Sequence, residues 1–362
     1  MRGLPPRVPY ATVAAWKTVL YARLAHAPEL LAQAAHALLG GPPTEAQLPE
    51  VLDLAALGWV DHEGWTLVER CVADGALPPG AARWAHEARS GLWVVERWDG
   101  EDVALRNLAT DAPSVVHAPG MEAELPPRAV LRAWLLPVGE RLVLSGTPDT
   151  WGPMGVIARM DLLAQWRATP EPALLERLAA LRAAFRRQRE ERDAFVAHFG
   201  ADLVTFPDPA TMERAFAELV NAVLNHARFP SLGGRTRAEA WRAAKGEDPK
   251  VIQVRLGGDL GGPGRHGIIY DAVEGVHVLP HLADVLDHLA GRGDHAETVR
   301  AYLADPGVTT LPFRRAAAAD PGATARLAAL IDVPDAPLET LLAPYKNLDG
   351  PVAPSVLPDF DD

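Results

Sequence analysis

The sequence predicts an α+β protein in which a small five-stranded β-barrel is flanked by helical regions. The main observation is the stretch 91–154, where short runs of β-branched and aromatic residues alternate with turn residues. The second is the helical spacing of apolar residues on both sides of that stretch. The third is a return of short strand-like runs after residue 250, among further helical segments. We therefore expect a helical N-terminal region, an SH3-like or OB-like barrel, a helical middle with one long helix, and a mixed α/β C-terminal part.

The region before the barrel reads as a series of helices. Apolar residues keep helical spacing from Tyr10 to Leu39, with a break at Pro28 because proline cannot continue the helical hydrogen bonds. A further helix is expected from Glu45 to Leu57, ended by Gly58. Another, from Gly80 to Ser90, leads into the barrel.

The barrel itself is predicted from strand runs and turn dipeptides. The strands are expected at Leu92–Trp98, Val103–Leu108, Ser114–Ala118, Val130–Val138 and Arg141–Ser145. Asp99-Gly100 is a strong hairpin dipeptide, and Gly139-Glu140 turns the last pair. Five short strands in about 55 residues are typical of a small closed or partly closed barrel. Such a barrel hosts many functions, so it assigns no activity.

Two helices are expected directly after the barrel, a short one from Val156 to Arg167 and a long one from Pro170 to Phe199. The apolar residues of the long helix recur in alternating steps of four and three, and Gln188 and Arg192 occupy positions in the same stripe. Its other face is rich in arginine and acidic residues, which we interpret as a solvated face with i,i+4 ion pairs. The alternative interpretation is a basic patch for nucleic acid or an acidic partner.

The chain then alternates between short strands and helices. A strand is expected at Leu203–Phe206, a helix capped by Asp208, and a second helix opened by the capping box of Thr236 and Glu239. Strands are expected at Val251–Leu256, Ile268–Ala272 and Val276–Leu279, followed by helices from Ala283 to Ala290 and from Thr298. The last 31 residues, with six prolines and a formal charge of −6, are expected to be extended and to lie on the body through Leu341, Tyr345 and Phe360, or to be partly disordered. The predicted regions are 1–89, 90–154, 155–246, 247–331 and 332–362.

Composition excludes some classes of protein. A net charge of −12 argues against a protein that coats a phosphate backbone, because that affinity comes from neutralising phosphates. The single cysteine, Cys71, excludes an intramolecular disulfide and a thiolate metal cluster. The start of the chain lacks a signal-peptide layout, and no apolar run is long enough to span a membrane. We therefore expect a cytoplasmic protein. Basic residues are nearly all arginine, which is typical of a GC-rich bacterial genome.

Two stretches carry a family resemblance. WTLVERCVADGALPPGAARWAHEARSGLWVVERWDGEDVALRNLATDAPSVVHAPG, continuing to LRAWLLPVGERLVLSG, resembles the central region of a group of poorly characterised bacterial proteins that often carry a SEC-C zinc-binding tail. LGGRTRAEAWRAA resembles the "GkTPreA" segment of such proteins, with Arg237 where proline is usual. The cysteine-rich tail is absent, so the resemblance implies no zinc site, and it implies no catalytic residue.

Motifs that carry chemistry are few. Gly262, Gly264 and Gly267 form a G-x-G-x-x-G pattern, but a dinucleotide loop needs a helix at its last glycine, and a strand is expected there instead. We interpret this loop as a hairpin or partner contact and name Gly262, Gly264, Arg265 and His266 as candidates. Histidines and carboxylates also gather nearby, at His266, Asp271, Glu274, His277, His281, Asp284, Asp287, His288 and His295. Their spacing does not bring three of them to one metal ion on one helix face, so separate hydrogen-bonded histidines are the preferred interpretation.

These observations favour a non-enzymatic adaptor or regulatory protein that contacts a macromolecule, with another protein as the expected partner. No catalytic, cofactor-binding or metal-binding residue is assigned, and the oligomeric state is left open. One alternative is nucleic-acid binding through the long helix and the barrel, because small barrels bind single strands by stacking bases on aromatic rings. Its candidate contacts are Arg177, Arg182, Arg186, Arg187, Arg189, Trp93, Trp98 and Trp134. A further alternative is a hydrolase that uses the cluster between residues 266 and 295.

Overall fold

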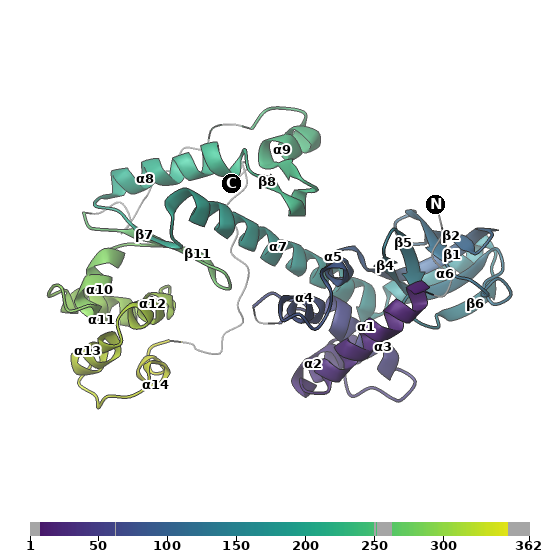
Figure 1. Ribbon diagram of the computed structural model, residues 1–362, viewed down its shortest axis with the longest axis horizontal. Helices are drawn as coiled ribbons and strands as arrows, with labels where there is room; N and C mark the ends of the chain where they lie inside the picture. Colours follow the sequence, from purple (N-terminus) through teal and green to yellow (C-terminus); the bar gives the residue numbers. More distant parts are fainter. Residues whose placement is uncertain (1–7, 62, 250, 252–262, 347–362) are drawn as a thin grey trace. The chain divides into compact units, whose positions relative to one another are not determined.

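The computed structural model describes residues 8–61, 63–249, 251 and 263–346, and the chain is drawn in Figure 1. It divides into two compact units, residues 1–182 and 183–362. Each unit has two hydrophobic clusters of its own among the described residues. The expected α+β architecture is therefore confirmed, whereas the predicted division into five regions stays a prediction.

The first unit contains the predicted β-barrel. Its strands are β1 (Arg89–Asp99), β2 (Asp102–Asn107), β3 (Pro113–His117), β4 (Ala129–Val138), β5 (Arg141–Leu144) and β6 (Asp149–Pro153). Strands β1, β2, β3, β5 and β4 pair in that order, and β4 pairs back to β1, which closes a five-stranded barrel. The β3–β5 pair is parallel and the others are antiparallel. Strand β6, which pairs with β4, was not predicted because DTWGP has no alternating pattern.

Strand β1 closes the barrel because it is long and bent. Its first half pairs with β4 and its second half continues along β2, with a register shift between Val95 and Arg97. A bulge of this kind sharpens the twist that a small barrel needs. Trp93, Val95, Leu105 and other alternating residues fill the interior. This alternation is the pattern from which the strands were predicted.

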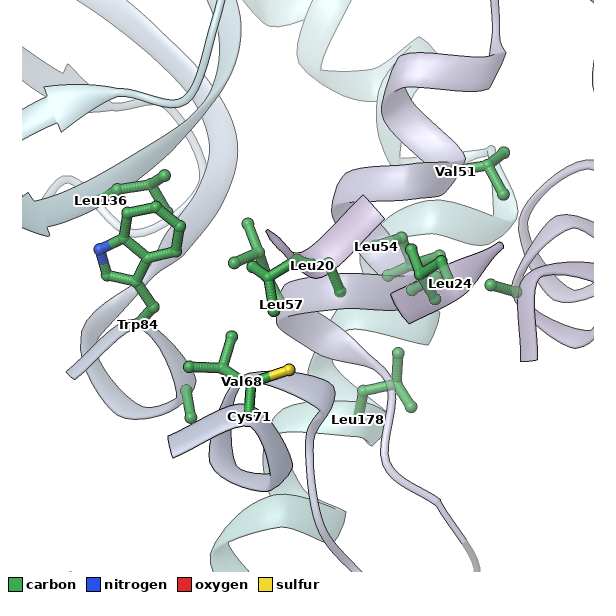
Figure 2. Packing of buried hydrophobic residues seen from close by; sticks show 14 of the residues in the cluster. Leu20, Leu24, Val51, Leu54, Leu57, Val68, Cys71, Trp84, Leu136 and Leu178 are labelled. Atoms are coloured by element: carbon green, nitrogen blue, oxygen red, sulfur yellow. The ribbon is translucent and has the colours of Figure 1, made fainter. Parts of the chain in front are cut away.

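A helical layer precedes the barrel in the same unit. It consists of α1 (Val8–Leu24), α2 (Pro28–Leu39), α3 (Leu48–Asp53), the π-helical turn η1 (Leu54–Gly58), α4 (Leu67–Ala73), the 3₁₀ turn η2 (Pro79–Ala81) and α5 (Ala82–Glu87). Figure 2 shows Leu20, Leu57 and Leu178 in one hydrophobic cluster with Trp84, whose ring lies beside Leu136 of the barrel. The indole of Trp84 also donates to the carbonyl of Pro137 over 2.9 Å. The helix expected from Gly80 to Ser90 is too long, because Arg89 and Ser90 already pair with β4.

The long predicted helix is α7 (Pro170–Phe199), whose last part belongs to the second unit. The other elements of that unit before residue 280 are β7 (Leu203–Thr205), α8 (Pro209–Glu218), the π-helical turn η3 (Leu219–Leu224), β8 (Arg228–Phe229), η4 (Pro230–Leu232), β9 (Arg235–Thr236), α9 (Arg237–Lys245), β10 (Gly267–Asp271) and β11 (Gly275–Leu279). Strands β11, β10 and β7 form an antiparallel sheet. Both predicted caps, Asp208 and the Thr236–Glu239 box, are present. The strand expected at Val251–Leu256 lies outside the described residues, apart from Val251.

Helices complete the second unit. They are α10 (Leu282–Leu289), α11 (Ala296–Ala304), α12 (Leu311–Ala319), α13 (Gly322–Leu330) and α14 (Leu338–Leu342). In Figure 1 these helices lie together, and their apolar side chains form one cluster with Ile269 of β10. The tail expected to be extended includes α14 instead, and Leu341, expected to lie on the body, is buried in that cluster with Leu342. Residues 347–362 of the tail, including Phe360, lie outside the described residues.

The polar positions in the stripe of α7 have partners on β10 and the turn after it. The side-chain amide of Gln188 donates to the carbonyls of Ala272 and Val273, both over 3.0 Å. Arg192 donates to the carbonyl of Tyr270 over 3.1 Å and to Asp202 over 2.9 Å. These hydrogen bonds explain why polar residues interrupt the apolar stripe.

Glu191, expected on the solvated face of α7, is instead fully buried. Its carboxylate pairs with Arg187 one turn earlier, over 2.8 Å, and with Arg237 at the start of α9. It also accepts a hydrogen bond from the hydroxyl of Tyr270 over 2.9 Å. Burial, and then the charge of Glu191, raise the pKa of Tyr270, so this hydroxyl keeps its proton. The three donors offset the loss of water around a buried charge.

The substitution Arg237→Ala should therefore lower the free energy of unfolding of the second unit by about 3–5 kcal/mol, because it leaves a buried carboxylate short of a cation. Urea denaturation of the full chain would measure the loss. The matched control is Arg228→Ala, which breaks an exposed pair with Glu239 at 3.4 Å and should cost about 0–1 kcal/mol. Equal losses in the two variants would contradict the role of the buried pair.

Candidate protein-interaction face

Helix α6 (Val156–Arg167) is the most unusual surface feature of the first unit. Its sequence, VIARMDLLAQWR, holds six large apolar residues among twelve. Val156, Ile157 and Met160 are 63%, 77% and 65% exposed. Among the described residues, only Leu48, Val115, Val251, Val333 and Tyr345 are other large hydrophobic residues classed as exposed, and these are spread along the chain. We call Val156, Ile157 and Met160 the α6 face.

No residue of α6 is buried, and none belongs to the hydrophobic clusters of the described chain. Its large apolar side chains cover more than half of the circumference of the helix rather than one narrow stripe, and a helix of that kind is ordinarily largely buried. An isolated helix of this length is also marginal in water, so tertiary contacts must hold it. Within the described residues, α6 thus lies outside the hydrophobic clusters, although Leu162, Leu163 and Trp166 are half-buried.

The main described hydrogen bond that holds the end of α6 goes to one buried carboxylate, and Arg167 also donates to the carbonyl of Ala109 over 3.5 Å. The indole of Trp166 donates to Glu171 at the start of α7 over 2.8 Å. Glu171 is 7% exposed and also pairs with Arg132 of β4 at 3.1 Å. Arg132 in turn pairs with Glu50 of α3. The end of α6 is thereby fixed to the barrel and the helical layer, while its first two turns present the α6 face to solvent.

The predicted tryptophan contacts take structural positions. Trp93 is 2% exposed and donates to the carbonyl of Ala133 over 3.2 Å. Trp98 is half-buried against the barrel core and donates to the carbonyl of Leu125 over 2.8 Å. Trp134 is half-buried against the helical layer. None of the three rings is classed as exposed, as base stacking would require.

The predicted arginine contacts of α7 are mostly held by the protein itself. Arg177 is exposed, whereas Arg186 and Arg189 are half-buried. Arg182 donates to the carbonyl of Gly58 over 2.6 Å. Arg187 pairs with the buried Glu191, as described above. The arrangement is therefore not a continuous exposed row of guanidinium groups.

The candidate loop is only partly visible, since Gly262 lies outside the described residues. Strand β10 begins at Gly267, so no helix follows the glycine pattern, as expected from the sequence. Arg265 pairs with Asp284 at 2.6 Å and Asp287 at 2.8 Å, and His266 is fully buried.

The histidines and carboxylates from 266 to 295 divide into separate groups. His266 lies beside His281, with ring centroids 5.4 Å apart. His277 faces Glu274 across 3.7 Å on the β10–β11 hairpin. His288 instead accepts a hydrogen bond from the backbone amide of His295 over 3.1 Å. Within the described ranges, no three histidine, cysteine or acidic side chains gather in a way that could hold a metal ion.

Cys71 is 1% exposed, and burial raises the pKa of its thiol, which keeps it protonated at neutral pH.

In the part of the chain that the structure describes, every helix is too short or too polar to cross a bilayer. No protein-family model, curated protein or solved structure matches this chain.

Sequence reasoning predicted helix α6 with its correct bounds but did not single out its surface. The available signal was composition, because large apolar residues occupy more than half of the circumference of this short helix. What remained hidden was that the barrel and the helical layer complete their own cores without it.

We predict that Trp166→Phe weakens the attachment of α6, because it removes one donor from the buried Glu171 carboxylate. The expected loss is about 1–3 kcal/mol in the free energy of unfolding of the first unit, with faster tryptic cleavage at Arg159. Urea denaturation and timed proteolysis measure the two effects. Trp151→Phe on β6 is the control, since no hydrogen bond is described for its indole. If Trp151→Phe accelerates cleavage as much, the Trp166–Glu171 bond does not hold the helix.

Proposed function

We propose that this chain is a non-enzymatic protein-interaction protein, an adaptor or regulator, and that the α6 face is its contact surface. The observation that carries the proposal is a helix with exposed large apolar residues that belongs to no hydrophobic cluster among the described residues. Exposed apolar patches on folded proteins mark sites where another macromolecule binds. Helix α6 is attached to the barrel by the Trp166–Glu171–Arg132 network, so the α6 face is held in a fixed orientation on the first unit.

A bacterial cytoplasmic setting belongs to the same proposal. It is supported by the arginine-rich composition and by the resemblance of Trp65–Gly146 to the central region of SEC-C-type bacterial proteins. Both remain inferences from the sequence.

The structure gives less support to nucleic-acid binding. Residues 89–153, which form the barrel, contain six basic and nine acidic residues, a formal charge of −3. The three candidate tryptophans pack against the hydrophobic clusters or donate to backbone carbonyls. Binding to a phosphate backbone depends on neutralising its charge, which this surface does not favour.

The double substitution Ile157→Ser and Met160→Ser should abolish partner capture without unfolding the chain. Burying two such side chains contributes about 3 kcal/mol, or roughly a hundredfold in Kd. Changes to exposed side chains away from structural contacts usually alter stability by about 0.5 kcal/mol or less. The measurement is cross-linking and affinity capture from a bacterial extract with the tagged full chain, followed by thermal unfolding of each variant.

The matched control is Val115→Ser, which removes an apolar side chain that is 62% exposed on β3. Proteins captured by the unsubstituted chain and by Val115→Ser, but lost from the double variant, are the expected partners. The proposal fails if all three chains capture the same proteins, or if the unsubstituted chain captures none.

We also predict no tight binding of single-stranded or duplex DNA or RNA, even at low salt. Fluorescence anisotropy of labelled oligonucleotides at two salt concentrations would measure it. Affinity that falls steeply with salt would show phosphate contacts and would replace the protein-partner proposal with nucleic-acid binding.

A further inference from the structure

The α6 face is centred on Met160. An α-helix turns by about 100° per residue, so Val156 and Ile157, one turn earlier, lie within about 60° of Met160 on its two sides. All three side chains are exposed, and they form a ridge on the first half of α6. A ridge of this kind packs into the groove between the side chains of a second helix.

The two neighbours of Met160 along the chain carry opposite charges. Arg159 and Asp161 precede and follow Met160 by one residue, so each lies about 100° from it, one on each side of the helix. Arg159 is half-buried and Asp161 is exposed. The α6 face therefore has a cation along one border and an anion along the other.

Neither of these charges is paired within the described chain. Among the described residues, no ion pair or side-chain hydrogen bond is found for Arg159 or Asp161. They do not face each other either, because residues two apart lie on different sides of a helix. The next basic residue of α6, Arg167, instead donates to the carbonyl of Ala109 after β2 over 3.5 Å. Arg159 and Asp161 are thus available to charges on another molecule.

Two copies of α6 can pair both borders at once. When two identical helices lie side by side and parallel, the two-fold axis runs along them, and each border faces the opposite border of the other helix. Arg159 of each copy then faces Asp161 of the other, and Met160 meets its own counterpart between the two ion pairs. In an antiparallel pair each border faces its own counterpart, so like charges meet, which is unfavourable. The charges therefore favour the parallel arrangement.

The two helices need to meet only along their first half. Packed helices cross at about 20–50°, so two helices that touch at Met160 have diverged at Arg167, which lies about 10 Å further along the axis. The end of each α6 therefore stays on its own barrel, where Trp166 donates to Glu171. An interface of this size is small, and it corresponds to a weak dimer that depends on concentration.

We propose, on the basis of the proposed function of the α6 face as a contact surface, that its partner is a second copy of this chain. The two copies join through parallel α6 helices and two reciprocal Arg159–Asp161 ion pairs. Burial of Ile157 and Met160 supplies the attraction. The ion pairs determine which partner is accepted and in which direction the helices lie.

Sedimentation velocity of the full chain at rising concentration tests this dimer. The unsubstituted chain should dimerise as its concentration rises. Arg159→Asp or Asp161→Arg alone should raise the Kd roughly tenfold, because each replaces two attractive pairs by two repulsive ones. The control is Arg177→Asp, which makes the same change of charge as Arg159→Asp at an exposed residue of α7 and should leave the Kd unchanged.

An equimolar mixture of the Arg159→Asp chain and the Asp161→Arg chain separates lost pairing from damaged folding. In the mixed dimer both facing pairs are again opposite in charge. The mixture should therefore dimerise with a Kd within about threefold of that of the unsubstituted chain, although neither variant does so alone. Recovery in the mixture also shows that both variants are folded.

The proposal is overturned if the unsubstituted chain stays monomeric up to about 100 µM, or if the mixture dimerises no better than its components. A monomeric chain whose captured proteins are still lost on Ile157→Ser and Met160→Ser would overturn only the self-association, because the α6 face then binds a different protein. Dimerisation that the same double substitution leaves unchanged would place the dimer on another surface and also overturn the proposal. The proposed function itself fails only if capture is unchanged as well.

Discussion

A buried carboxylate needs hydrogen-bond donors in place of the water that it loses. Helix α7 carries two buried carboxylates, Glu171 and Glu191. Glu171 receives Trp166 and Arg132 in the first unit. Glu191 receives Arg187, Arg237 and Tyr270 in the second. Each unit therefore depends on a charged group of one helix to order elements that come from distant parts of the sequence. Apolar packing fills the cores, but the ion pairs and hydrogen bonds of Glu171 and Glu191 determine which helices and strands lie next to α7.

The same constraint explains the isolated position of α6. Its last turn is drawn to Glu171 by a polar bond, so the helix is oriented without contributing to the core. The large side chains on its first two turns are then left in water, which is costly unless something covers them. In the barrel, by contrast, apolar side chains alternate inward and are covered by the opposite strands. Within one unit, the apolar side chains of the barrel are therefore covered by the fold itself, whereas those of the α6 face are left for a binding partner to cover.

Much of the fold could be predicted because its signals are local. The five barrel strands, the break at Pro28, the long helix and the caps at Asp208 and Thr236 each follow from neighbouring residues. Burial of charge could not be predicted in this way. Glu191 sits among arginines in a segment that reads as solvated, and only its pairing with Arg237, 46 residues away, shows that it is buried. The role of Trp166 was hidden as well, because the burial of its partner Glu171 depends on packing next to Arg132 of β4.

The glycine pattern of residues 262–267 shows how a motif takes its meaning from packing. A phosphate-binding loop uses glycines so that a ligand can approach the backbone. Here the approaching groups belong to the chain. Gly264 leaves room for the ring of His281, and a Cβ on Gly267 would lie 2.6 Å from the side chain of Leu282 and 2.8 Å from the carbonyl of Val204. Both described glycines thus let residues 264–267 pack closely against the start of α10 and against β7.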